Sequence, residues 1–299
     1  MFADDSNLLI RGNNMRDLCG VLNHELEHIN DFFKANKLKL NTKKTKLVCF
    51  RKKSQKIDYI ANTILLDGDK VNFDEEAVFL GITIDSHLTW DRHCNKVANI
   101  ISRNNGMLNR AKNRVPAPSL KILYSSFILP HLQYGLAAWG GCSGQNKKRI
   151  VMIQKRAIRT INKSYMTAHT EPRMKKMGLL KLEELYFQQC ATFIHDITNK
   201  RAPPAMNYLI TLNTEITSRN LRIHSTDPLH VRVPPNRCRF SANSFCYKGS
   251  QLWNTIPQEI RSINEKHIFK NRLKKHLLSQ YSESTACNNQ RCTDRRHHH

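Results

Sequence analysis

Two adjacent carboxylates, Asp4 and Asp5, open the segment "FADDSNLLI". Carboxylate oxygens are ligands that Mg²⁺ prefers, so the pair could form one side of a metal site. The same residue types also form solvated turns, because Asp and Ser side chains accept hydrogen bonds from nearby backbone amides. We expect a turn that leads into a strand in the apolar run that follows. The pair alone does not decide between a turn and a metal site.

A basic helix face is the second feature that could do chemistry. In "KKRIVMIQKRAIRTINK", a helical period of about 100° per residue places four apolar residues on one face, namely Ile150, Ile153, Ala157 and Ile161. The opposite face carries six cations, namely Lys148, Arg149, Lys155, Arg156, Arg159 and Lys163. Such a face is either solvated or in contact with phosphates. The charge of the whole chain favours phosphate contact.

That charge is strongly positive. The 299 residues include 48 Lys and Arg against 24 Asp and Glu, which gives a net charge of +24 and a pI near 9.9. Chains this basic usually have a polyanionic partner, of which nucleic acid is the commonest. An anionic membrane surface is the rival, but the basic residues fall within amphipathic helices and not in a juxtamembrane cluster.

The location expected for the chain is nuclear, cytoplasmic or both. No run of about 18 apolar residues predicts a transmembrane helix. Acids at positions 4 and 5 do not suit the basic start of a secretory signal. Nine dispersed cysteines indicate reduced thiols and not a disulfide framework.

The first 90 residues have the pattern strand, helix, strand, strand, strand. After the apolar run that follows Asp5, a helix capped by Asn13 or Asn14 carries an apolar stripe. The stripe consists of Met15, Leu18, Leu22, Leu26, Ile29 and Phe33. Strands are predicted over 47–50 and in "TILLDG" and "VFLGITID", where Gly68 and Gly81 mark turns.

From about Asp91 the pattern is helical. The segment "APSLKILYSSFILPHLQYGLAAWG" predicts an apolar helix that Pro130 must end or kink. A linker is expected over 199–207. A last helix follows it, with apolar residues four apart at Phe269, Leu273 and Leu277 and with Lys270, Lys274 and Lys275 open to solvent or ligand. The fold class is therefore α+β for residues 1 to about 90 and mostly α thereafter.

Several other Cys, His and Trp residues could be either structural or functional. Cys287, Cys292 and His297 to His299 could form a zinc site, but they lie in a polar tail that predicts disorder. Cys190 and His195 share one apolar segment, and core packing explains them more simply. Trp139 and Trp253 are expected to fill cores, although either could stack on a base.

The order of "FADD", "NKLKLNTKKTKLVCF" and "FLGITIDSHLTWDRH" resembles the last three catalytic-core motifs of reverse transcriptases from non-LTR (LINE-type, jockey-like) retrotransposons. Further along, "LKILYSSFILPHLQYGLAAWG", "IQKRAIRTI" and "LWNTIPQEIRSINEKHIFKNRLKKHL" resemble their thumb and C-terminal region. The resemblance spans residues 2 to about 281. It implies the end of the palm over 1–90, a helical thumb over 91–200, a C-terminal region over 201–281 and a disordered tail over 282–299.

The resemblance also implies roles for individual residues. Asp4 matches a ligand of the catalytic Mg²⁺ ions, and Asp5 matches its supporting carboxylate. Lys44 matches a lysine near the phosphates of the incoming nucleotide. Phe79, Leu80 and Gly81 match the primer-grip hairpin. The implied partners are an RNA template, a DNA primer and deoxynucleotides, with no membrane involved.

One departure from the family limits what this chain could do alone. No segment of these 299 residues matches the family's other metal-binding aspartate or its fingers. A single ligand carboxylate and its neighbour cannot offset the mutual repulsion of two closely spaced dications. We therefore expect a truncated polymerase that binds template–primer without extending it. The alternatives are a non-catalytic, basic nucleic-acid-binding protein derived from a retroelement, and a reading frame without function.

Overall fold

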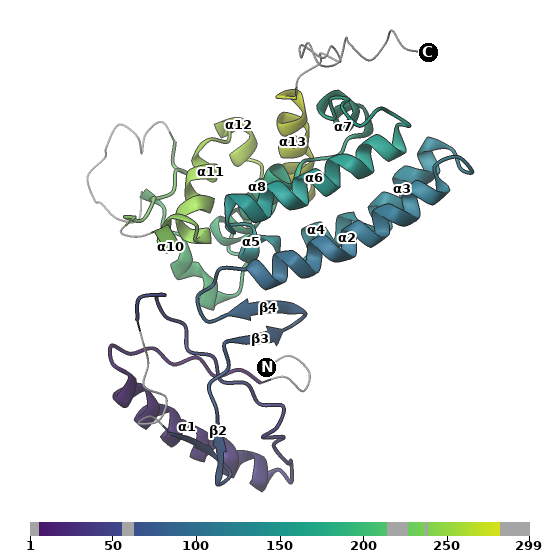
Figure 1. Ribbon diagram of the computed structural model, residues 1–299. Coiled ribbons are helices and arrows are strands. Elements are labelled where there is room, and N and C mark those ends of the chain that lie inside the picture. The colour runs from purple at the N-terminus through teal and green to yellow at the C-terminus, as the bar shows by residue number, and fades with distance from the viewer. Residues whose placement is uncertain (1–5, 56–62, 214–226, 237–238, 282–299) are drawn as a thin grey trace. The chain divides into compact units, whose positions relative to one another are not determined.

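The computed structural model describes residues 6–55, 63–213, 227–236 and 239–281. The chain divides into two compact units, Met1–Arg92 and His93–His299, and each is described by itself. The first combines one long helix with two small antiparallel sheets, whereas the second is mostly helical (Figure 1). This mixture agrees with the predicted α+β class.

Helix α1 (Met15–Ala35) builds the core of the first unit. The Oδ1 atom of Asn14 accepts a hydrogen bond of 2.8 Å from the backbone N–H of Asp17, which caps the helix as predicted. One face of α1 packs on strand β1 (Ile64–Leu66), which pairs with β2 (Asp69–Val71). The buried residues of this small core are Cys19, Ile64, Leu66 and Val71.

Both sheets are two-stranded hairpins with two-residue turns. In the first, Ile64 pairs with Val71 across a turn in which Asp67 and Gly68 have φ of 53° and 83°. The second pairs β3 (Glu76–Phe79) with β4 (Ile82–Asp85), and its turn holds Leu80 and Gly81 at φ of 46° and 78°. Tight hairpins need positive φ at both turn positions, which glycine adopts without strain. The turns predicted at the two glycines are confirmed.

The strand predicted over 47–50 is wrong. Leu47 forms a single parallel bridge with Phe73, and its carbonyl accepts from the N–H of Asp74 at 2.7 Å. Four residues later, the N–H of Arg51 donates instead to the carbonyl of Ser86, at 3.0 Å. Because this segment changes partner within four residues, no continuous ladder forms.

One further strand prediction is wrong, and one strand was not predicted. Residues 6–10 form no strand, and Leu9 is 83% exposed, because no other described segment pairs with this apolar run. The sequence also gave no sign of β2, since "DKV" is polar at two of its three positions.

The second unit is assembled around helix α8 (Leu182–Thr198), which packs against α4, α5, α6, α11 and α13. The other elements of this unit, in chain order, are α2 (Asp91–Ala111), α3 (Ala117–Phe127), α4 (Leu129–Gln133), α5 (Leu136–Trp139), α6 (Gly144–Ile161), α7 (Glu171–Met177), η1 (Pro204–Leu209), α10 (Arg239–Ala242), η3 (Phe245–Gly249), α11 (Ser250–Asn254), α12 (Gln258–Arg261) and α13 (Lys266–Ser279). Pro130 lies in the first turn of α4, so the apolar segment breaks where it was predicted to break.

The core of this unit holds both tryptophans and the predicted stripe of α13. Trp139 and Trp253 are fully buried, and each indole N–H donates to a backbone carbonyl. Phe269, Leu273 and Leu277 are buried on α13, which packs against α8. The expected linker contains a turn at Lys200 and the start of η1. Across the described ranges, no helix is both long enough and apolar enough to cross a bilayer.

Candidate nucleic-acid interface

The predicted metal ligands lie outside the described residues. This holds for Asp4 and Asp5, and also for the Cys and His residues of the tail. Within the described ranges, no group of three or more His, Cys, Asp or Glu side chains is placed to hold a metal ion. The expectations for Mg²⁺ and zinc therefore stay predictions.

Lys44 lies in a turn that Asn41 organises. The backbone N–H of Lys44 donates to the carbonyl and to Oδ1 of Asn41, at 3.0 and 3.1 Å. Thr45 Oγ1 donates to the same carbonyl at 3.1 Å. The Lys44 side chain is exposed, while the nearby Lys46 is paired with Asp74 at 2.7 Å. The turn thus presents the Lys44 ammonium to solvent, where a phosphate could reach it.

The β3–β4 hairpin, with Leu80 and Gly81 in its turn, is braced at its open end. Arg51 Nη2 donates to Glu75 Oε1 at 2.9 Å, and Ser86 Oγ donates to the other oxygen of that carboxylate. The Asp85 carboxylate accepts from the backbone N–H groups of residues 87, 89 and 90. These contacts fix the base of the hairpin.

Helix α6 carries the basic face that the sequence predicted. Its four apolar residues are buried, and the Ser143 side chain caps the N-terminus by accepting from the Asn146 N–H at 3.3 Å. Lys148, Arg156 and Lys163 are exposed and Lys155 is half-buried. Within the described part of the chain, these four side chains make no ion pair or hydrogen bond, so they are open to a ligand.

The other two cations of this face are held by the protein. Arg149 donates to the Oδ1 atoms of Asn95 and Asn99 on α2, the second at 3.3 Å. Arg159 Nε donates to the carbonyl of Ala168 at 2.9 Å. Burial lowers the pKa of Arg159, and the positive charges of Arg173 and Arg156 lower that pKa further. An arginine nevertheless stays charged, so both side chains are cations with fixed positions.

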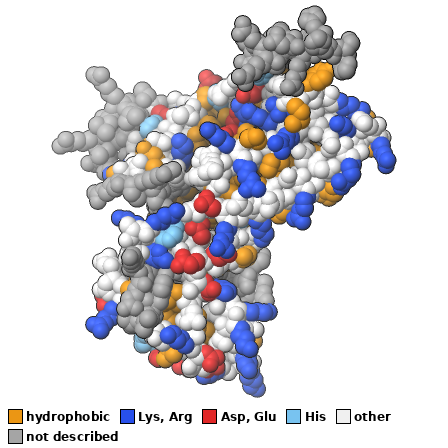
Figure 2. Space-filling model, in the orientation of Figure 1, with side chains coloured by type: hydrophobic (Ala, Val, Ile, Leu, Met, Phe, Trp, Pro, Cys, Tyr) orange, Lys and Arg blue, Asp and Glu red, His pale blue; other side chains and the backbone are white. Residues whose placement is uncertain are grey.

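Two basic neighbours were not predicted because they come from other helices. Arg173 of α7 approaches Arg159, and Lys121 of α3 approaches Lys274 of α13. Burial lowers the pKa of Lys274, and the charges of Lys121 and Lys270 add to this shift. On the face shown in Figure 2, Lys and Arg side chains recur along the helical unit and acids are fewer. No periodicity within one helix could have indicated these pairs.

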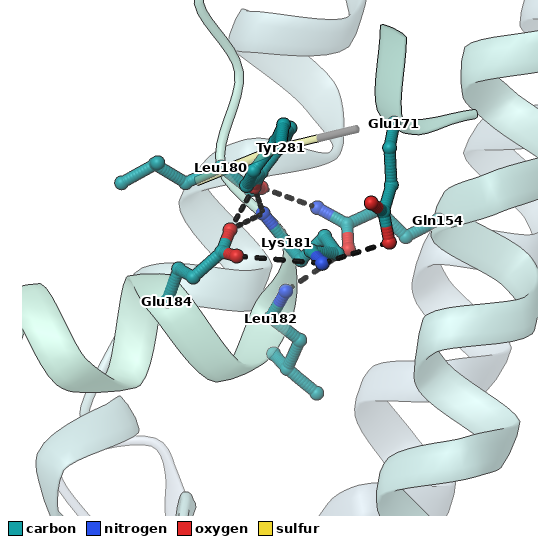
Figure 3. Close-up of polar contacts among 7 residues, drawn as sticks. All are labelled: Gln154, Glu171, Leu180, Lys181, Leu182, Glu184 and Tyr281. Carbon is teal, nitrogen blue, oxygen red and sulfur yellow. Dashed lines mark hydrogen bonds and ion pairs between the residues drawn. The ribbon is translucent and has the colours of Figure 1, made fainter. Parts of the chain in front are cut away.

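A polar network anchors the buried side of α6 (Figure 3). Gln154 Nε2 donates to the Leu180 carbonyl and to the Tyr124 hydroxyl, both at 3.0 Å, and its Oε1 accepts from the Leu182 N–H at 3.1 Å. Lys181, the residue before α8, pairs with Glu171 at 3.0 Å. These contacts tie α6 to α3 and α8, and they tie the start of α8 to α7, so the basic face is carried on a fixed support.

Comparison with known proteins finds similarity to two polymerases. No family model and no solved structure matches it. The chain is 29% identical over 163 residues to a probable RNA-directed DNA polymerase from transposon BS of Drosophila melanogaster. It is 21% identical over 165 residues to the RNA-directed DNA polymerase from mobile element jockey of the same organism. The resemblance to non-LTR reverse transcriptases is confirmed.

The similarity is limited in extent. Each match covers 54% of this chain and 18% of the relative, so the chain spans less than a fifth of the length of the polymerases it matches. The similarity to the polymerases of the jockey and BS elements therefore covers about half of the chain.

Proposed function

We propose that the chain is part of an RNA-directed DNA polymerase of a non-LTR retrotransposon, and that it binds template–primer nucleic acid through the basic face of α6. The relatives named above support the polymerase assignment. The observation that carries the binding proposal is a set of four cations that make no ion pair or side-chain hydrogen bond among the described residues. Lys148, Lys155 and Arg156 lie on α6, whose other face is buried, and Lys163 lies just after its C-terminus.

Binding by this face would be driven by phosphate contacts. Each cation that neutralises a phosphate releases condensed counterions, and the logarithm of the affinity then falls by about 0.9 per contact for each tenfold rise in salt. Contact with about six phosphates would give a slope near −5. Such contacts carry little sequence preference, which suits a polymerase that moves along its template.

The roles suggested for the first unit complete the proposal. Asp4, supported by Asp5, would contribute to holding Mg²⁺ in the intact polymerase, where the ions activate the attacking oxygen and stabilise the leaving one. Lys44 would lie near the phosphates of the incoming deoxynucleotide, and Phe79, Leu80 and Gly81 near the primer end. The exposed Lys44 ammonium and the braced hairpin are compatible with these roles.

The test is binding of an RNA–DNA duplex to the full chain, measured by fluorescence anisotropy at several salt concentrations. Changing Lys148, Lys155 and Arg156 together to Gln should reduce the slope by about 2.7, because three phosphate contacts are lost. The matched control changes the exposed Lys52, Lys53 and Lys70 to Gln and removes the same charge. Equal effects of the two triple variants, or a slope near zero for the unchanged chain, would refute the proposal.

A further inference from the structure

The loop between α6 and α7 presents an aromatic ring to solvent. The Ser164 N–H donates to the Arg159 carbonyl at 3.0 Å, and the Ala168 N–H donates to the Tyr165 carbonyl at 3.1 Å. These turns place residues 165 and 166 outward, and Tyr165 is 87% exposed while Met166 is 68% exposed. The loop is therefore internally hydrogen-bonded and carries an unpacked ring and thioether at its tip.

Three arginines surround the base of this loop. Arg159 Nε donates to the Ala168 carbonyl at 2.9 Å, and Arg173 Nη1 donates to the next carbonyl, that of His169, at 2.5 Å. Two guanidinium groups from different helices are thus fixed on neighbouring carbonyls of one loop. Arg156 lies one helical turn before Arg159.

Within the described ranges, none of these three arginines forms an ion pair with an acid. Glu171, at the start of α7, is paired with Lys181. Burial lowers the pKa of Arg159, and the positive charges of Arg173 and Arg156 lower this pKa further, so both of them lie near Arg159. An anion bound between them would offset these positive charges, and planar guanidinium groups match the oxygens of a phosphate.

We propose that Tyr165 and the cluster of Arg156, Arg159 and Arg173 form a subsite for an unpaired nucleotide. The arginines hold its phosphate and Tyr165 stacks on its base. This inference rests on the proposed function and specifies which part of the nucleic acid meets the loop. Bases inside a duplex are already stacked on their neighbours, so an exposed ring finds a free base face only where the strand is single.

The arrangement also lowers the cost of binding. Because Arg159 and Arg173 are already held by backbone carbonyls, little side-chain freedom remains to be lost when a phosphate arrives. Each guanidinium uses one face of its fork for the carbonyl and keeps other N–H groups for the ligand. Lys163, exposed at the start of the loop, adds a further positive charge.

The test compares two ligands on the full chain by fluorescence anisotropy, namely a blunt RNA–DNA duplex and the same duplex with a single-stranded overhang of roughly four nucleotides. Tyr165→Ala should weaken binding of the overhang ligand by about 5- to 150-fold, the range measured for loss of one base–aromatic stack, and leave the blunt duplex unchanged. Tyr165→Phe should bind like the unchanged chain, since the ring remains.

Two further variants complete the experiment. Arg173→Gln should weaken the overhang ligand and reduce the salt slope of a free single strand by about 0.7, which corresponds to one phosphate contact. Tyr208→Ala removes a tyrosine of η1 that is also largely exposed, and it should change neither ligand. Thermal melting of each variant checks that the chain stays folded.

The outcomes separate this inference from the proposed function. If Tyr165→Ala weakens both ligands equally, or neither, the subsite is refuted while duplex binding by α6 stands. If the unchanged chain binds no duplex but binds the free single strand in a Tyr165-dependent way, the duplex proposal fails and the subsite stands. If no nucleic acid is bound at low salt, both fail.

Discussion

Gln154→Leu should destabilise the helical unit more than any surface change. The Gln154 side chain is 1% exposed and makes three hydrogen bonds, two through Nε2 and one through Oε1. Leucine has a similar volume but no polar atoms, so the change removes all three bonds without opening a large cavity. Three groups of the surrounding protein then lose their partner, namely the Tyr124 hydroxyl, the Leu180 carbonyl and the Leu182 N–H.

The magnitude follows from those three groups. A buried polar group left without a hydrogen bond costs about 1–3 kcal/mol. Taking about 1–2 kcal/mol for each, the free energy of unfolding should fall by roughly 3–6 kcal/mol, a large share of the 5–15 kcal/mol typical of a domain. Burial already raises the pKa of Tyr124 to about 12, and the bond from Gln154 opposes that rise, so the variant should raise this pKa further.

The assay is urea unfolding of the full chain, followed by the fluorescence of the buried Trp139 and Trp253. The double variant Tyr124→Phe, Gln154→Leu is the control, because it removes one of the stranded groups and should recover about 1–3 kcal/mol. A Gln154→Leu chain within about 1 kcal/mol of the unchanged protein, or a double variant less stable than the single one, would refute this account.

Three other predictions concern pH, local stability and catalysis. Burial lowers the pKa of His195, whose Nε2–H donates to the Ile263 carbonyl. The stability that this histidine contributes is therefore present above pH 6.5 and is lost as the pH falls below that value. The urea midpoint of the unchanged chain should fall as the pH is lowered, and the midpoint of His195→Gln should fall less. Amide hydrogens of residues 63–92 should exchange faster than those of α8, because the first unit has only a small core, and uniform protection would contradict this. The 299-residue chain should not extend a primer with Mg²⁺ and nucleotides; template-dependent extension that is lost on Asp4→Ala would overturn the ligand-counting argument.

Local sequence patterns account for what could be predicted, and contacts between residues far apart in the sequence account for what could not. The apolar faces of α6 and α13 were predictable because a helix buries one side at a fixed period, as Ile150 and Phe269 show. The segment 47–50 has the composition of a strand, but the hydrogen bonds around it go to Asp74 and to Ser86, and no local sequence pattern indicates this change of partner. The approach of Arg173 to Arg159 depends on how α7 folds back on α6, so the arginine cluster had no signal in the sequence.

The hydrogen bonds that tie α8 to residues far along the sequence have a consequence during synthesis. The Lys181 N–H donates to the Tyr281 hydroxyl at 2.8 Å, across 100 residues of sequence (Figure 3). His195 likewise donates to the carbonyl of Ile263, which is made 68 residues later. A ribosome makes the chain from its N-terminus, so nascent α8 must expose its apolar surface until α13 has emerged. The helical unit should therefore fold late and in one step, and a stalled nascent chain lacking α13 would be a substrate for chaperones.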